Sequence, residues 1–264
     1  MRMFVDDLKK NFLTIKTLIC TISVVIVSLL CFNQDLLYIF TNTSENSTSI
    51  IELIDYLLGI GIFRNLILII ISVPFVEVFC EDWNNKNIYS VITRCNIKKY
   101  SKVKILSSVV GAISVSFIGF LLLAFLLSFF MPLSTDQTVN NFVTEEPYGF
   151  LVNGYPFIYL IVRLLIFSLF SSIWVIVGLF FSTIIPNNFV SLAMPLISYY
   201  FIGNLCDYLP KFININYLTN CTNILGGNAI ITFVYSLLFF IVLILVFIKL
   251  FNVMVQRRIN NEFN

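Results

Sequence analysis

Six long apolar runs alternate with polar segments along the chain. They cover about residues 17–40, 51–79, 103–130, 156–183, 189–205 and 229–250. An apolar stretch of about 18 residues or more with few charges is typical of a transmembrane helix, because about 20 residues cross the hydrocarbon core of a bilayer. The pattern predicts an all-α, polytopic membrane protein with six transmembrane helices and a single transmembrane domain over residues 1–264.

Residues 1–16, before the first run, have an amphipathic pattern. Met3, Phe4, Leu8 and Phe12 can lie on one side of a helix, with most of the charged residues elsewhere. We predict a helix at the membrane–water interface; the alternative is a basic tail that only fixes the orientation. We expect no cleavable signal peptide, because this segment is polar and no small-residue cleavage site follows the first run.

Composition supports the membrane assignment and excludes several kinds of site. Hydrophobic residues make up 59% of the chain and charged residues 11%, and the mean hydropathy is +0.95. A soluble globular domain does not have this balance. The chain has no histidine, which excludes metalloprotease sites, haem ligation and nucleophilic triads that depend on histidine.

If each apolar run crosses the membrane, most of the basic residues lie in segments on the same side of it. Four precede the first run, six lie in residues 81–104 at the start of the third run, and three lie from Lys249 onward. The segments on the other side contain only Lys211, while Arg64 and Arg163 lie within runs. Because Lys and Arg near span ends are retained in the cytoplasm, we predict that both termini are cytoplasmic.

The most basic of these segments, residues 81–104, has internal order, and we call it the coupling loop. Ile88, Val91 and Ile92 fall at positions i, i+3 and i+4 and so share one face of a helix. Tyr89 and Arg94 flank this apolar face. The pattern predicts a short amphipathic helix along the cytoplasmic membrane surface.

Polar residues mark the start of this loop. An asparagine, Asn85 or Asn87, is expected to cap the helix, because its side chain can accept a hydrogen bond from a free backbone N–H. Glu77 and Glu81 lie where the second run leaves the membrane. A catalytic carboxylate pair is one interpretation; beside a basic loop, salt bridges to Lys98, Lys102 or a partner protein are favoured.

The loop contains, in order, a glutamate, a polar turn, a hydrophobic helix, an arginine and a lysine that begins the third run. These positions are Glu81, Asn85-Lys86-Asn87-Ile88, Val91-Ile92, Arg94, Ile97-Lys98, Tyr100 and Lys104. The order resembles the first cytoplasmic loop of ABC type-2 exporter permeases. Lys86-Asn87 stands where that family commonly has Gly-Thr, and Cys95-Asn96 stands where it has a Pro-containing step.

The resemblance implies the membrane-spanning subunit of an ATP-binding-cassette exporter. In the family this loop docks onto a separate ATPase subunit, and the residues that would make the contact are Glu81, Ile88, Tyr89, Val91, Ile92 and Arg94. Two permeases, identical or paralogous, would lie side by side in the lipid bilayer, each with one ATPase. Small permeases of this kind lie in the plasma membrane of Gram-positive bacteria and export amphipathic substrates such as antimicrobial peptides (lantibiotics, bacitracin), lipids or drugs.

The chain itself lacks a phosphate-binding loop, because it contains no Gly-Lys dipeptide. We therefore expect no cofactor on this chain, no enzymatic activity of its own and no nucleic-acid partner, with ATP and Mg held by the partner ATPase. The alternative function is a six-span channel or secondary transporter without an ATPase. Such proteins usually place ionisable residues near the midplane or show internal repeats, and no repeat is visible here. An intramembrane protease would need a histidine or paired acids deep in the spans.

Arg64 and Arg163 are the arginines within the apolar runs, in the predicted outer halves of the second and fourth spans. One interpretation is that they reach outer-leaflet phosphates or pair with Asp35, Asp55 or Asp207. The other is that they line the exit of a translocation path and attract an anionic or amphipathic substrate.

Two cysteines flank much of the predicted outer loop, residues 206–228. Cys206 and Cys221 would lie outside the reducing cytoplasm, where disulfides persist. A bridge between them is one possibility and two free thiols are the other.

Overall fold

In the part of the chain that it describes, the computed structural model consists of helices joined by turns and loops. That part comprises residues 2–12, 14–32, 48–60, 62–136, 138–139, 149–206, 208–219 and 229–263. Within these ranges there is no β-strand, so the predicted all-α class is confirmed for them. The helices, in chain order, are α1 (Arg2–Phe12), α2 (Ile15–Cys31), α4 (Ile50–Ile60), α5 (Ile62–Val76), α6 (Val78–Asn84), α7 (Asn87–Arg94), α8 (Ile97–Leu127), α10 (Gly149–Gly154), α11 (Pro156–Ile184), α12 (Asn188–Cys206), α13 (Ile215–Thr219) and α14 (Ala229–Phe263).

Five helical segments of the described chain are long and apolar enough to cross a membrane. They are Phe63–Asn84, Ile97–Leu127, Pro156–Ile184, Asn188–Cys206 and Ile230–Asn261. The α1–α2 pair, bent by 55°, makes a sixth if it is counted as one span. By the length and composition of its helices, the protein has five or six candidate membrane-spanning segments among the described residues, whereas the apolar runs predict six.

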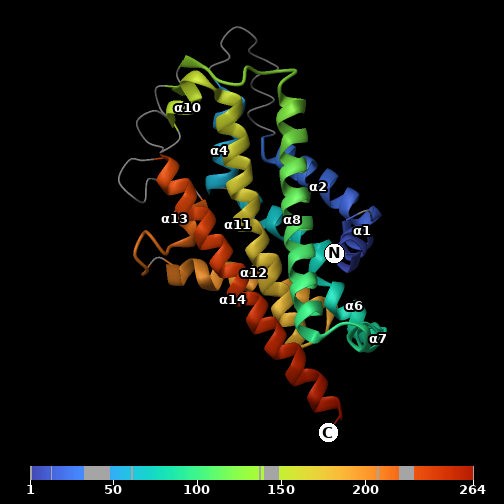
Figure 1. The fold of residues 1–264 in the computed structure, drawn as a ribbon. Coiled ribbons are helices and arrows are strands. Elements are labelled where there is room, and N and C mark those ends of the chain that lie inside the picture. The colour runs from blue at the N-terminus through green and yellow to red at the C-terminus, as the bar shows by residue number, and fades with distance from the viewer. Residues whose placement is uncertain are drawn as a thin grey trace.

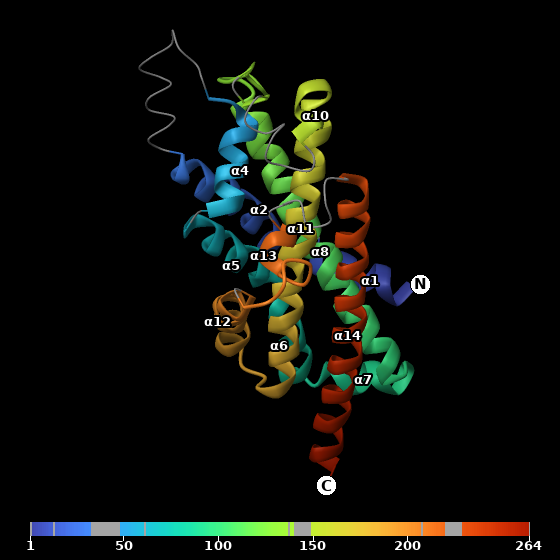
Figure 2. The same cartoon turned by 90° about the vertical axis from the view of Figure 1, so that its left-hand side faces the viewer.

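Helix α11 is the centre of the bundle. It contacts α5, α8, α12 and α14, and α8, α11 and α14 run along the long axis in both views (Figure 1 and Figure 2). In its most apolar window 78% of the residues are buried within the protein, compared with 22% in the windows of α12 and α14. The apolar outer faces of α12 and α14 are thus left for lipid or another membrane protein.

The two ends of the bundle carry different elements. Helices α6 and α7 and the C-terminus lie at one end, while α4 and α10 lie at the other (Figure 1). We call the first the basic end, because it also holds the lysines at the start of α8 and the arginines near the end of α14. The other is called the opposite end.

Several boundaries differ from the predicted ones. The second run, expected as one helix over residues 51–79, is divided into α4, α5 and α6. Pro74 lies two residues before the end of α5, where its missing N–H and its ring disturb the helical hydrogen bonds. Helix α8 begins earlier than residue 103, because the Asn96 side chain accepts a hydrogen bond from the Lys98 N–H and caps it. Helix α14 continues past residue 250 to Phe263.

Glycines allow the central helices to approach closely. A Cβ at Gly111 of α8 would lie 2.3 Å from the Phe75 ring of α5, and one at Gly178 of α11 would lie 2.7 Å from Pro195 of α12. Small residues at such crossings are typical of membrane helices, where close backbone packing drives association. These contacts bring α5 close to α8 and α11 close to α12.

Candidate functional site

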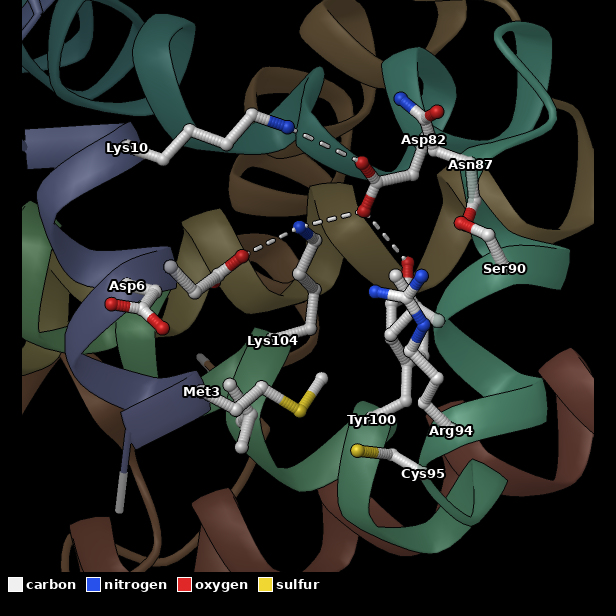
Figure 3. Close-up of a pocket in the computed structure, with 13 residues that line it drawn as sticks. Met3, Asp6, Lys10, Asp82, Asn87, Ser90, Arg94, Cys95, Tyr100 and Lys104 are labelled. Carbon is white, nitrogen blue, oxygen red and sulfur yellow. Dashed lines mark hydrogen bonds and ion pairs between the residues drawn. The ribbon is translucent and has the colours of Figure 1, made fainter.

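A cavity of about 420 Å³ lies at the basic end between α1, α6, α7 and α8. Figure 3 shows the residues that line it, and the charged groups of Lys10, Asp82 and Lys104 point toward one another between α1 and α6. Among the lining residues, Asn87, Ser90 and Arg94 come from the predicted coupling helix α7. The site therefore joins the N-terminal helix to the coupling loop.

Lys104 is the centre of this site. Its side chain is only 3% exposed, and its Nζ lies 2.7 Å from Asp82 Oδ2 and 3.0 Å from Asp7 Oδ1. The Tyr100 hydroxyl donates to the same Asp82 oxygen at 3.1 Å (Figure 3). A buried charge is tolerated where paired and hydrogen-bonded, and removing one partner of such a pair is costly. Lys104 thereby ties α8 to both α1 and α6.

Helix α1 docks on the bundle through its polar side. Asp7 also accepts hydrogen bonds from the Ser107 hydroxyl and, at 3.2 Å, from Asn11 Nδ2. Lys10, which is exposed, lies 3.6 Å from Asp82. Residues 2–12 are helical, as predicted, and Thr14 caps the following helix by accepting from the Thr17 N–H. The N-terminal segment is therefore part of this site, which we call the coupling site, and is not a free tail.

Helix α7 occupies the place where the sequence predicts the coupling helix. Its start is formed by Lys86 in a left-handed conformation with φ of 57°, and no side chain caps it. The expected cap from Asn85 or Asn87 is therefore wrong, because Asn87 is already the first helical residue and the turn is made by the backbone of Lys86. Glycine adopts this conformation at the least cost, and it is the residue that permeases of the resembling family commonly have here.

The apolar face of α7 is turned toward the bundle. Ile88 is fully buried, and Tyr89, Val91 and Ile92 pack partly buried against the core. The exposed residues of α7 are polar: Asn87, Ser90, Thr93 and Arg94. The apolar residues thus hold α7 on its own protein, and the surface it offers outward is polar and basic.

The two glutamates at the start of the loop have a partner that the sequence does not indicate. Lys16, at the start of α2, lies 3.0 Å from Glu81 and 3.4 Å from Glu77. The expected salt bridges to Lys98 or Lys102 are thus replaced by one to the N-terminal part of the chain. Glu81 is nevertheless partly exposed at the basic end.

A second polar site, which we call the arginine cluster, lies within the bundle toward the opposite end. Arg163 of α11 forms an ion pair with Asp55 of α4, and Tyr159 donates to the same carboxylate at 2.6 Å. The guanidinium also donates to the Thr219 carbonyl of α13 at 2.7 Å. Of the predicted aspartate partners, Asp55 is thus the one found; Asp35 and Asp207 lie outside the described residues.

Arg64 joins this cluster from α5. It is 7% exposed and donates to the Thr219 hydroxyl at 3.2 Å and to the Gly59 carbonyl at 3.3 Å. Its guanidinium lies 5.9 Å from the Phe167 ring centroid and 5.8 Å from that of Tyr199, distances typical of cation–π contacts. Both predicted arginines therefore converge on Thr219, the last residue of α13.

The proposed disulfide stays a prediction. Cys206 is buried at the end of α12, and its carbonyl accepts a hydrogen bond from Asn214 at 2.8 Å. Cys221 lies outside the described residues. Among those residues, no cluster of cysteine and acidic side chains has the arrangement of a metal site.

Sequence reasoning missed Asp7, Asp82, Tyr159 and Thr219 as members of these sites. Asp82 carries the clearest signal, because it is an acidic residue in a short helix that is otherwise mostly apolar or aromatic. The other three have no local signal, since the partners that bring them into these sites are 56 to 155 residues away.

Comparisons of the chain with models of known protein families, with curated proteins and with solved structures find no match. The case for a function therefore depends on the geometry and charge of the coupling site and on the order of residues in the coupling loop.

Proposed function

We propose that this protein is the membrane-spanning permease subunit of an ATP-binding-cassette exporter, in the plasma membrane of a Gram-positive bacterium. A separate ATPase subunit would bind ATP and Mg and supply the energy. The observation that carries the proposal is α7, a short helix at the basic end with buried apolar residues and an exposed polar side. Such a helix offers a docking surface while staying attached to the spans.

The distribution of charge orients the protein. The basic end would face the cytoplasm, because Lys and Arg near span ends are retained there. Both termini and α7 would then lie on the side where ATP is available. The opposite end, with α4 and α10, would face outward.

The coupling site provides a route for motion. Force applied to α7 reaches α6 through the short link at residues 85–86 and reaches α8 through Cys95 and Asn96. Lys104 then ties α6, α8 and α1 together by ion pairs of 2.7 and 3.0 Å. A rigid unit of this kind would pass closure of the ATPases to α1, α6 and α8 at once.

The left-handed turn at Lys86 independently supports the resemblance. A residue with φ of 57° precedes α7, at the position where the exporter permeases commonly have glycine. Non-glycine residues adopt positive φ rarely. The same backbone turn would therefore fit both sequences, although a positive φ costs lysine more conformational free energy than it costs glycine.

The transported substrate would be an amphipathic molecule such as an antimicrobial peptide, lipid or drug. It would leave between this chain and a second permease, identical or paralogous, and export of such peptides would confer resistance to them. The arginine cluster lies toward the proposed exit, where guanidinium groups attract anionic groups.

An ATPase-independent channel or secondary transporter is the second candidate. The observation that favours it is the burial of Arg64 and Arg163 within the bundle, since ionisable residues inside spans mark ion or substrate pathways in such proteins. Both arginines are engaged with Asp55, Gly59 or Thr219, which fits a structural role equally well.

A photo-crosslinking amino acid at Ser90, on the exposed side of α7, tests the proposal in the native host. We expect the crosslinked product to contain a protein with an ATP-binding P-loop, identified by mass spectrometry. Tyr208, which is 90% exposed and lies in the segment between α12 and α13, is the matched control position and should give no such product. A full-length protein in the membrane that captures no ATPase through Ser90 would contradict the proposal.

The isolated chain provides a second test. It should neither bind nor hydrolyse ATP, because no phosphate-binding loop is present in the sequence. Together with the captured ATPase, it should form a complex that hydrolyses ATP. Arg94→Glu should reduce co-purification of the ATPase, whereas Lys99→Glu, an exposed charge reversal at the start of α8, should have a smaller effect.

A further inference from the structure

The last part of α14 is packed onto the basic end. Phe251, Val255 and Ile259 are buried, and their spacing of four residues places them along one side of the helix. Phe251 makes an edge-to-face contact with Phe79 of α6, with ring centroids 5.6 Å apart. The end of α14 therefore lies against the segment that leads to the coupling helix.

Arg258 lies on this side of α14 and makes three contacts at once. Its Nη1 donates to the carbonyls of Thr183 and Ile184 at 2.8 and 2.7 Å. Its guanidinium carbon lies 4.7 Å from the centre of the Trp83 ring in α6. A cation near the last carbonyls of a helix interacts favourably with the helix dipole, and a guanidinium over an indole face is the best cation–π pair.

Trp83 continues this series of contacts to the coupling helix. Its ring stacks on Phe79 at 6.0 Å between centroids and lies 6.1 Å from the ring of Tyr89 in α7. Tyr89 is one of the residues expected to act in ATPase coupling. Arg258 is thus connected to α7 through a single aromatic side chain, and to α11 through two backbone carbonyls.

We infer that Arg258 is a positioning residue that fixes the corner between α6 and α7 to the ends of α11 and α14. It is a second attachment, separate from Lys104, which ties the same corner to α1 and α8. Its mechanical consequence rests on the proposed function: motion of α7 would reach the central helix α11 and the last helix α14. The attachment itself is a property of the free chain.

Tryptophan fluorescence can measure the attachment directly, because the chain has only two tryptophans. In a Trp174→Phe background, Trp83 is the sole emitter. Replacing Arg258 by alanine should shift its emission to longer wavelength and make quenching by acrylamide steeper, since the guanidinium no longer covers the indole. Arg258→Lys, which keeps a cation, should restore part of the shielding.

Arg257→Ala is the matched control, because Arg257 is the exposed neighbour on the same helix. It should leave Trp83 emission and quenching unchanged. If Arg258→Ala and Arg257→Ala give the same Trp83 signal as the parent protein, the inference is overturned. If Arg258→Ala does not give a monodisperse protein in detergent, Arg258→Lys and Arg258→Gln are compared with the parent protein instead. Equal Trp83 emission and quenching in all three proteins would also overturn the inference.

The complex with the ATPase separates this inference from the proposed function. We expect Arg258→Ala to retain ATPase binding but lose stimulation of ATP hydrolysis by substrate. Loss of the Trp83 shielding with full retention of stimulation would refute the mechanical role of Arg258. A parent protein that binds no ATPase would refute the proposed function, while the Trp83 measurement would still decide whether Arg258 positions the corner.

Discussion

Lys86 has the least favourable backbone conformation among the described non-glycine residues, since it alone has a positive φ. The left-handed region costs an L-residue about 1–2 kcal/mol, and glycine's greater loss of chain entropy offsets part of any gain. Lys86→Gly should therefore raise stability by up to about 1 kcal/mol. Thermal unfolding in detergent measures this. Lys86→Val, with a β-branched side chain, should lower the midpoint, and equal midpoints for the two variants would refute the left-handed turn.

Asp55 is the residue on which the arginine cluster depends. Replacing it by asparagine leaves the Arg163 guanidinium, which is 5% exposed, without its carboxylate. Breaking a buried ion pair by removing one partner costs about 3–5 kcal/mol, so we expect a large loss of stability or yield. Asp136→Asn, at an exposed aspartate toward the same end, should behave like the parent. A stable Asp55→Asn protein would show that the pair contributes little.

At the scale of elements, the docking of α1 depends on Lys104. Lys104→Met removes the cation between Asp7 and Asp82 and leaves two largely buried carboxylates facing each other. We expect α1 to detach, so that its backbone amides exchange hydrogen faster by mass spectrometry. Lys102→Met, an exposed lysine one half-turn earlier, is the control. Unchanged protection of residues 2–12 in Lys104→Met would mean that packing alone holds α1.

The crossing of α11 and α12 tolerates no added atom at Gly178. An alanine Cβ there would lie 2.7 Å from Pro195 and 2.8 Å from Val76, and overpacking of a well-packed core typically costs about 1–3 kcal/mol. Gly178→Ala should lower the unfolding midpoint measured in detergent. Gly203→Ala, on α12 with no atom within 4 Å of the new Cβ, should be neutral or slightly stabilising. A midpoint for Gly178→Ala at or above the parent value contradicts the close crossing.

At the scale of the whole molecule, the orientation can be tested with single cysteines in a cysteine-free background. Lys98→Cys, at the basic end, should react with a membrane-impermeant maleimide only after the cells are permeabilised. Tyr208→Cys, at a residue that is 90% exposed, should react in intact cells. The reverse pattern would place the basic end outside and would also exclude docking of a cytoplasmic ATPase on α7.

The helical class, most of the spans and the short helix in the coupling loop follow from the sequence, because each depends on local periodicity. Ile88, Val91 and Ile92 share a helical face whatever they pack against. The partner of that face is a different matter: spacing alone cannot distinguish the chain's own core from a second protein, and in the structure the face lies toward the core.

Contacts between distant residues are what sequence reasoning could not supply. Lys16 binds Glu81 from 65 residues away, and Arg64 meets Thr219 from 155 residues away. Which lysine or hydroxyl reaches a given charge depends on how helices cross, and several candidates were chemically equivalent. Asp55 is one of three aspartates that the sequence offers as partners for Arg64 and Arg163. The sequence shows that a buried arginine needs a partner, but not which helix supplies it.

The separation between Asp7 and Lys104 also sets an order of events during synthesis. Their partnership spans 97 residues, and ribosomes add about 5–20 residues per second, so α1 waits roughly 5–20 s for the lysine that will hold it. During that interval, before Lys104 is synthesised, the amphipathic helix α1 can lie on the bilayer surface. Arg258 is synthesised 75 residues after Thr183, so the hydrogen bond between them forms later still. A nascent chain therefore acquires its spans first, and the contacts that hold α1, α6, α11 and α14 together at the basic end form last.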